Sequence, residues 1–169
     1  MERVEITLTD MPVHSFTTAI GSCSIWWDAE RVTRFMLLTA DDKSEQPPTW
    51  ITPLIERVKN HLRDGGEDFA DTPLNWAQVT LFQKRVYEAA LETKSGQTAT
   101  YGDLAKAIGE VPGVSRAVGT ALGQNPWPLL VPCHRFVGAA GKMTGFSAPG
   151  GIETKLKLLA IEGSQLFAV

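Results

Sequence analysis

The chain has 169 residues, 43% of them hydrophobic and 21% charged, which is enough apolar material for a packed core in one domain or two small ones. Its apolar runs are too short to cross a bilayer, and the opening segment MERVEITLTD lacks the pattern of a secretory signal, so we expect a cytoplasmic protein with no membrane partner. The two cysteines, Cys23 and Cys133, have no zinc-binding spacing, so we expect free thiols, no metal and no other cofactor.

The net charge of −3 conceals an uneven distribution along the chain. Residues 1–80 carry 7 Lys/Arg against 13 Asp/Glu. Residues 111–160 carry one acidic residue, Glu153, and five basic ones: Arg116, Arg135, Lys142, Lys155 and Lys157. Such asymmetry suggests that the second part meets a polyanion such as nucleic acid, although solvated surface charge can also fall this way by chance.

The first part of the chain has the pattern of a small α+β layer. Short strands are expected at residues 4–8, 24–27 and 32–38, followed by a polar, Pro-bearing linker at 40–50. A helix is expected next, with one apolar face, and Gly65-Gly66 should end it. The residues of that face are Ile51, Leu54, Ile55, Val58 and Leu62. Strands followed by a helix predict an N-terminal sheet-plus-helix domain over residues 1–75.

From Thr80 the pattern becomes helical, which predicts a mostly helical C-terminal domain over residues 76–169. Thr80 and Gln83 fit a capping box at the start of a helix that runs to about Thr93. Its expected buried face is Phe82, Val86, Ala89 and Ala90. A second helix begins after Thr100, and a third runs from Ser115 to Gly123 beyond a turn containing Pro112. The last two fit a helix-turn-helix, with an ordinary helical hairpin as the alternative.

The outer face of the third helix is unusual because it combines small residues with one arginine. Ala117, Gly119 and Thr120 would allow close approach of another body, either a packed helix or a DNA groove. Arg116 lies at the helix start, where the helix dipole does not favour a cation, so it has either a functional role or a surface salt bridge.

Cys133 follows a short apolar run and Pro132, and it precedes His134, Arg135 and a glycine-rich loop. A thiolate is the reactive form of cysteine, and a neighbouring proton acceptor or cation favours it. The alternatives are an inert buried cysteine or a Cys-His hydrolase, although adjacent residues seldom place an imidazole directly on the sulfur. A metal site is disfavoured, because His14, His61 and Cys23 lack ligand spacing to this pair.

The segment VPCHRF, with Asn125-Pro126 before it and GKMTGF and LLAIEG after it, resembles the active-site region of the O6-alkylguanine-DNA alkyltransferase family. The resemblance covers residues 80–163 and includes TLFQKRVYEAAL, TYGDLA and SRAVGTAL. Residues 1–75 are similar to the family's ribonuclease-H-like N-terminal domain only in length and pattern.

This resemblance implies repair of double-stranded DNA containing O6-alkylguanine, by stoichiometric transfer of the alkyl group to Cys133 in a monomeric protein. It further implies that His134 removes the thiol proton through a water and that Glu162 orients the histidine. Asn125 would brace the turn beneath the site, and Tyr101 would donate a hydrogen bond to the departing guanine.

For DNA binding, the resemblance implies that the third helix enters the minor groove and that Arg116 takes the place of the flipped nucleotide. The implied DNA contacts are Ser115, Arg116, Ala117, Thr120, Ala121 and Arg135. The implied lining of the base pocket is Tyr101, Pro132, Val137, Phe146 and Ser147.

The chain departs from the family pattern at a few positions. Phe136 stands where valine is usual, Phe146 where tyrosine is common, and the segment SAPGG is slightly longer than usual. Cys133 itself separates the chain from alkyltransferase-like proteins, which carry tryptophan there and bind lesions without repairing them. The main alternative function is a non-repairing DNA-binding module, and the presence of Cys133 speaks against it.

Overall fold

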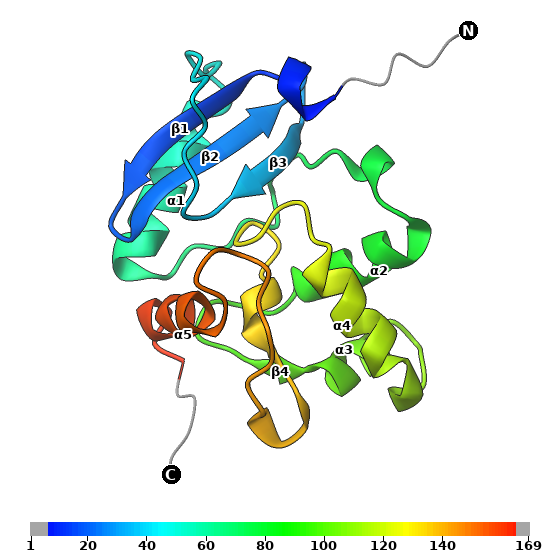
Figure 1. Ribbon diagram of the computed structural model, residues 1–169. Coiled ribbons are helices and arrows are strands. Elements are labelled where there is room, and N and C mark those ends of the chain that lie inside the picture. The colour runs from blue at the N-terminus through cyan, green and yellow to red at the C-terminus, as the bar shows by residue number, and fades with distance from the viewer. Residues whose placement is uncertain (1–6, 165–169) are drawn as a thin grey trace, which may run out of the picture.

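The computed structural model describes residues 7–164, and its N-terminal part is built on a three-stranded antiparallel sheet (Figure 1). The strands are β1 (Val13–Thr18), β2 (Gly21–Trp27) and β3 (Val32–Met36), in that order across the sheet. Phe16 lies opposite Cys23, and Ile25 lies opposite Phe35, which places buried side chains in register across all three strands.

Two of the three predicted strands are confirmed, as β2 and β3, and one observed strand was not predicted. The buried residues Val13 and Phe16 of β1 are three positions apart, so the strand lacks the period of two by which half-buried strands are recognised. The strand predicted at residues 4–8 falls mostly outside the described residues, and Leu8 begins a short 3-10 turn, Leu8–Asp10.

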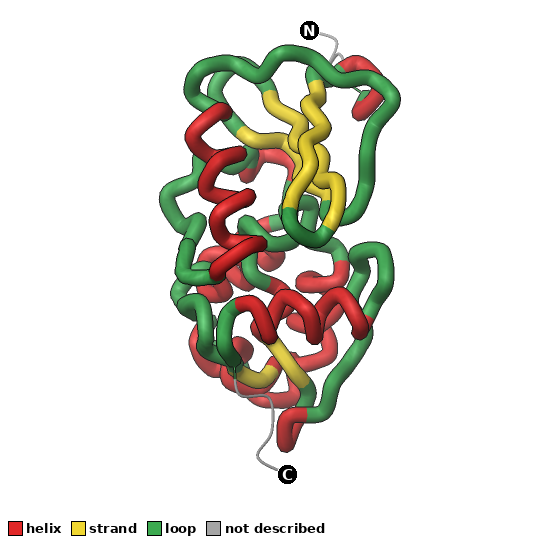
Figure 2. The backbone as a smooth tube through the Cα atoms, turned by 90° about the vertical axis from the view of Figure 1, so that its left-hand side faces the viewer, coloured by secondary structure: helices red, strands yellow, loops and turns green. Residues whose placement is uncertain are grey.

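Helix α1 (Thr52–Asp64) lies along the sheet, as Figure 2 shows, and its buried face is the predicted one with His61 added. Gly65 ends the helix with a φ of 70°, a conformation that favours glycine. A Cβ atom at Gly65 would lie 2.6 Å from the carbonyl oxygen of Ile161, so glycine also allows the end of α1 to approach the C-terminal helix closely.

The remaining helices are α2 (Leu81–Ala90), α3 (Tyr101–Ala107), α4 (Ser115–Gly123) and α5 (Ile152–Ile161). The capping box of Thr80 with Gln83 is confirmed, and Thr100 forms a second one with Asp103. Helix α2 ends earlier than predicted, and Tyr87 is buried where Phe82 and Ala89 are only half-buried. Tyr87 can be buried because its hydroxyl donates a 2.6 Å hydrogen bond to the carbonyl oxygen of Ala121.

Helices α3 and α4 pack against each other across the turn Pro112–Val114, an arrangement that fits both the predicted helix-turn-helix and an ordinary helical hairpin. Strands β4 (Ala99–Thr100) and β5 (Phe136–Val137) form a short parallel pair. Because α3 follows β4 directly and β5 follows the Cys133 turn, this pair fixes the start of α3 beside that turn.

The two parts of the chain are joined through their interiors as well as through the backbone. The indole nitrogen of Trp127 donates a 3.0 Å hydrogen bond to the carbonyl oxygen of Val32, and the amide of Phe35 donates one of the same length to Pro126. Side chains from both parts belong to a single cluster of buried hydrophobic residues. The fold is α+β, as predicted, and the domain boundary at residue 75 stays a prediction. Among the helices of residues 7–164, none combines the length and the hydropathy that a bilayer crossing requires.

Candidate active site

Cys133 lies at the start of a single 3-10 turn, Cys133–Arg135, and is only 5% exposed. The buried side chain of Asn125 braces the segment that leads to it. Its amide nitrogen donates to the carbonyl oxygen of Val131 at 3.0 Å, and its amide oxygen accepts from the backbone of Trp127 at 2.9 Å. Asn125 thus provides a partner for the buried amide of Trp127, and it shares the carbonyl oxygen of Val131 with the amide of Cys133.

A small cavity of about 40 Å³ lies over Cys133. Its lining comprises Tyr101, Gly119, Leu122, Gly123, Cys133, Gly145, Phe146, Ser147 and Lys155. Three predicted pocket residues are present, whereas Pro132 and Val137 are not in the lining; Val137 instead pairs with Thr100. The volume suits a water molecule but is far below the roughly 300 Å³ of ordinary small-ligand pockets. The lining would therefore have to open before a nucleobase could enter.

The thiol of Cys133 needs a base. Burial raises its pKa, while a hydrogen bond from Asn125 and the positive charge of Lys155 act in the opposite direction. Because burial is the largest of these effects, the resting group is a protonated thiol, which is a poor nucleophile.

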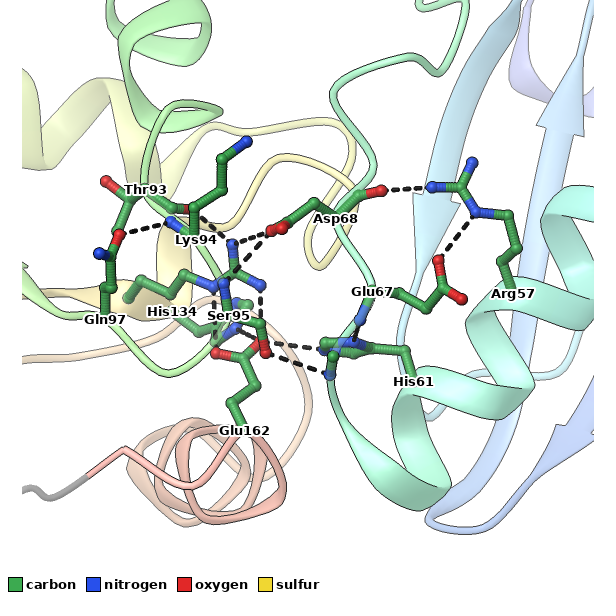
Figure 3. A network of polar contacts seen from close by, with 12 residues as sticks. Arg57, His61, Glu67, Asp68, Thr93, Lys94, Ser95, Gln97, His134 and Glu162 are labelled. Atoms are coloured by element: carbon green, nitrogen blue, oxygen red, sulfur yellow. Dashed lines mark hydrogen bonds and ion pairs between the residues drawn. The ribbon is translucent and has the colours of Figure 1, made fainter.

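His134 follows Cys133 in the same turn, and its ring is held by Glu162. Its Nε2 donates a 2.7 Å hydrogen bond to Oε1 of Glu162, so the proton of the neutral ring is on Nε2 and the lone pair is on Nδ1 (Figure 3). Nδ1 is buried and has no hydrogen-bond partner within residues 7–164. Burial lowers the pKa of His134, against the pull of Glu162, so the ring is neutral at neutral pH and Nδ1 can accept a proton.

Arg135 holds Glu162 from the other side, which corrects its assignment as a DNA contact. The guanidinium is buried, and Nε and Nη2 donate to the two oxygens of Glu162 at 3.0 and 2.9 Å. Nη1 also pairs with Asp68 at 3.2 Å. A side chain that is 2% exposed and bound in this way cannot reach a phosphate.

Glu162 therefore carries its charge inside the protein. Burial alone would raise its pKa, but the hydrogen bonds from His134, His61 and Arg135 hold the pKa of this carboxyl far below its usual range. A permanently charged carboxylate behind His134 fixes the ring tautomer and stabilises the imidazolium formed when Nδ1 takes a proton.

Sequence reasoning missed Lys155 as a site residue and counted it among the cations facing a polyanion. Its side chain is buried, lines the cavity beside Cys133, and has Nζ 5.9 Å from the centre of the Tyr101 ring. Burial lowers the pKa of this ammonium, and the neighbouring Cys133 opposes that shift. A signal was present, because Lys155 is three and four positions before Leu158 and Leu159 and so shares the apolar face of α5.

His61 was also missed, having been considered only as a metal ligand. Its Nε2 lies 2.9 Å from Oε1 of Glu162, the same oxygen that His134 contacts. Its place on the apolar face of α1, beside Val58 and Leu62, was the available signal. The described part of the chain contains no group of three or more His, Cys, Asp or Glu side chains arranged to hold a metal ion.

The outer face of α4 borders a shallow groove that leads to the cavity. Arg116, Ala117 and Thr120 are exposed, and the groove shares Tyr101 with the Cys133 cavity. Ser115 is half-buried and donates its hydroxyl to the carbonyl oxygen of Pro112. Ala121 faces the interior, where its carbonyl accepts from Tyr87, so its assignment as a DNA contact is wrong.

Residues 81–164 match the family model of the 6-O-methylguanine DNA methyltransferase DNA-binding domain. A methylated-DNA–protein-cysteine methyltransferase of Methanosarcina acetivorans is 51% identical over 154 residues, which is 88% of this chain and 96% of the relative. The chain belongs to the methylated-DNA–protein-cysteine methyltransferase family. The match to the Mycobacterium tuberculosis member is 50% identical over 86 residues, so there the chain spans about half the length of that curated relative.

Solved structures of methyltransferases agree with this membership over most of the chain. The structure of Mycobacterium tuberculosis OGT in complex with DNA superposes with a TM-score of 0.76 at 31% identity, covering 89% of this chain and 92% of the other. The O6-methylguanine-DNA methyltransferase from Pyrococcus kodakaraensis gives a TM-score of 0.67 at 30% identity, covering 90% and 99%.

Within this methyltransferase fold, the structure brings the predicted catalytic residues into one region. Cys133, His134, Glu162 and Asn125 are buried together, and Tyr101 lies across the cavity from them. The SAPGG segment is anchored at its middle, since Ala148 is buried and the hydroxyl of Thr154 donates to Pro149.

Proposed function

We propose that this protein repairs DNA by moving the alkyl group of O6-alkylguanine onto Sγ of its own Cys133. The observation that carries the proposal is a buried Cys133 in the same short turn as a buried His134. The free Nδ1 of that ring is buried, and its Nε2 is anchored on a charged Glu162.

The transfer begins with the thiol proton. A water bridging Cys133 and His134 carries this proton to Nδ1, and the resulting imidazolium is stabilised by Glu162. The thiolate attacks the alkyl carbon, a C–S bond forms, and the C–O6 bond breaks with its electron pair going to the guanine. The hydroxyl of Tyr101 donates to the guanine as negative charge develops, which makes guanine a better leaving group.

DNA binding places the target base over Cys133, in a cavity whose lining opens to admit it. An O6-alkyl group inside a duplex is out of reach of a buried thiol, so the nucleotide must rotate out of the stack, at a cost of a few kcal/mol. The exposed face of α4 enters the minor groove, and Arg116 fills the vacated space. The shared position of Tyr101 in the groove and the cavity supports a continuous path from that face to Cys133.

The product is a thioether, and its C–S bond is not one that a histidine base can hydrolyse. We infer a single transfer for each protein molecule, carried out by a monomer on double-stranded DNA in the cytoplasm.

Mass spectrometry after incubation with a methylated duplex tests the proposal. The peptide containing Cys133 should gain the mass of one methylene group, to a limit of one per molecule. Cys133→Ser should gain nothing, whereas Cys23→Ala, which removes the other buried thiol, should react like the wild type. DNA binding without a mass change would identify a non-repairing binding protein, and turnover beyond one equivalent would contradict the single transfer.

A further inference from the structure

The carboxylate that orients His134 is held by a residue from the opposite end of the fold. His61 lies near the end of α1, 101 positions before Glu162, and the two side chains are 1% and 0% exposed. We propose that His61 is a positioning residue for alkyl transfer, through which α1 holds the carboxylate of Glu162 in the place where it orients His134. This inference rests on the proposed function and assigns a role in it to the N-terminal part of the chain.

The hydrogen bonds of His61 fix its protonation state. The backbone amide of Glu67 donates to Nδ1 at 3.1 Å, so Nδ1 carries a lone pair and no proton. The proton of the ring must then be on Nε2, which donates to Oε1 of Glu162 at 2.9 Å. His61 is therefore a neutral donor with both nitrogens satisfied, as a fully buried imidazole requires.

Oε1 of Glu162 receives three N–H groups from two parts of the fold. His134 and Arg135 donate from the Cys133–Arg135 turn, and His61 donates from α1. If one of these three donors is lost, the carboxylate can move, and its negative charge is then stabilised by the two donors that remain. Figure 3 shows the Glu162 side chain, which follows the last residue of α5, directed toward His134 and His61.

The charged groups around His134 determine how loss of the His61 hydrogen bond would change the pKa of His134. Glu162 faces it from α5, Arg135 from its own turn, and Asp68 pairs with Arg135 from the segment after α1. Lys155 acts on the adjacent Cys133 from the same α5. If His61 no longer donates, the carboxylate attracts a proton on His134 more strongly. The pKa of His134 then rises, so less of the ring is in the neutral form that accepts the thiol proton.

A purely structural role for His61 gives a different expectation. The His61 ring packs edge-on against Phe69, with 5.6 Å between the ring centres. Gly65, whose amide donates to the carbonyl oxygen of His61, leaves no room for a Cβ atom beside the backbone of Ile161 in α5. Loss of packing alone would lower the stability of the protein and would leave the pH dependence of the reaction where it was.

The test compares His61→Leu with His61→Gln, whose amide retains an N–H for Glu162, and with Val58→Ala. Val58 is buried one turn earlier in α1, so its truncation removes packing without touching Glu162. The rate of alkyl transfer from free O6-benzylguanine is measured against pH for each protein. We expect the acid limb of the profile to move up by roughly one pH unit in His61→Leu, with partial return in His61→Gln and no shift in Val58→Ala. Should His61→Leu not fold, His61→Met fills a similar volume and replaces it.

A second readout does not depend on alkyl transfer. The chain has three histidines, so the ring nitrogens of His134 can be assigned by nitrogen NMR and titrated directly. The midpoint for His134 should rise in His61→Leu. If the wild type transfers no alkyl group, the proposed function fails while this titration still tests His61. The positioning role would be overturned if His61→Leu and Val58→Ala had the same His134 titration midpoint and the same pH–rate profile.

Discussion

Nζ of Lys155 donates a 2.5 Å hydrogen bond to the carbonyl oxygen of Phe136, three residues beyond the cysteine whose thiol it faces. The bond ties α5 to the end of the Cys133 turn, and it holds a positive charge inside the cavity. A buried lysine without this acceptor would be costly, since an isolated ammonium is rarely tolerated in an apolar interior.

Lys155→Met should therefore slow the reaction at the thiol. The substitution removes the cation that opposes the effect of burial on Cys133, so the pKa of the thiol should rise further. A rise of one unit in the thiol pKa corresponds to about tenfold less thiolate at neutral pH. We expect the rate of transfer from free O6-benzylguanine to fall by about tenfold or more. Lys157→Met, on the exposed face of the same helix, is the matched control and should react at the wild-type rate.

Arg116→Ala should separate the reaction in DNA from the reaction with a free base. The side chain is exposed at the start of α4 and does not line the Cys133 cavity. We expect at least about a tenfold loss of repair rate on a methylated duplex, because unstacking is no longer offset, and little change with free O6-benzylguanine. Arg63→Ala, an exposed arginine at the end of α1, should change neither rate. Equal losses on both substrates in Arg116→Ala would contradict the role of Arg116 in base flipping.

The histidine and carboxylate of the site predict a loss of stability below about pH 6.5, and the buried thiols predict a loss above about pH 9, which the lowered pKa of Lys155 partly offsets. His134 has a lowered pKa, so below its ordinary value of 6.5 the unfolded chain binds a proton that the folded protein does not, and stability falls as the pH falls. Glu162 acts in the same direction below 4.5. Cys133 lowers stability at alkaline pH, because its thiol ionises above pH 9.0 in the unfolded chain but stays protonated in the folded protein. Cys23, whose pKa burial raises to about 11, adds to this loss of stability.

Urea unfolding across the pH range checks this expectation. Each such group contributes a slope of up to about 1.4 kcal/mol per pH unit in its window. The free energy of unfolding should decline below pH 6.5 and decline more steeply below pH 4.5. On the alkaline side, Cys23→Ala should reduce the decline. A constant free energy from pH 8 to pH 5 would rule out a buried, neutral His134.

The parts of the fold that could be predicted from the sequence are those specified by neighbouring residues. The capping box of Thr80 depends on Gln83, three positions away, and the ends of α1 and α4 follow from nearby glycines. Strand β1 was missed because its burial is decided by its pairing with β2 and by α1, and its own pattern does not alternate.

The site was predictable where the family resemblance names a motif, and not where a side chain's direction depends on distant partners. Arg135 and Lys155 have the charge of DNA contacts, yet both are directed inward by acceptors on other elements, Glu162 and the carbonyl of Phe136. His61 gave no sign of its partner, since nothing near it in the chain indicates a carboxylate at position 162. Composition and motif spacing report residue type, whereas burial of a charge depends on which acceptors the folded chain brings to it.

The contact between His61 and Glu162 also has a consequence for the timing of protein synthesis. A growing chain contains Cys133 and His134 well before it contains Glu162, which lies 28 residues after His134. Until α5 has been synthesised and has docked on α1, the imidazole lacks the carboxylate that fixes its tautomer, and the thiol lacks an oriented base. Under the mechanism proposed above, Cys133 is therefore activated only after α1 and α5 have met.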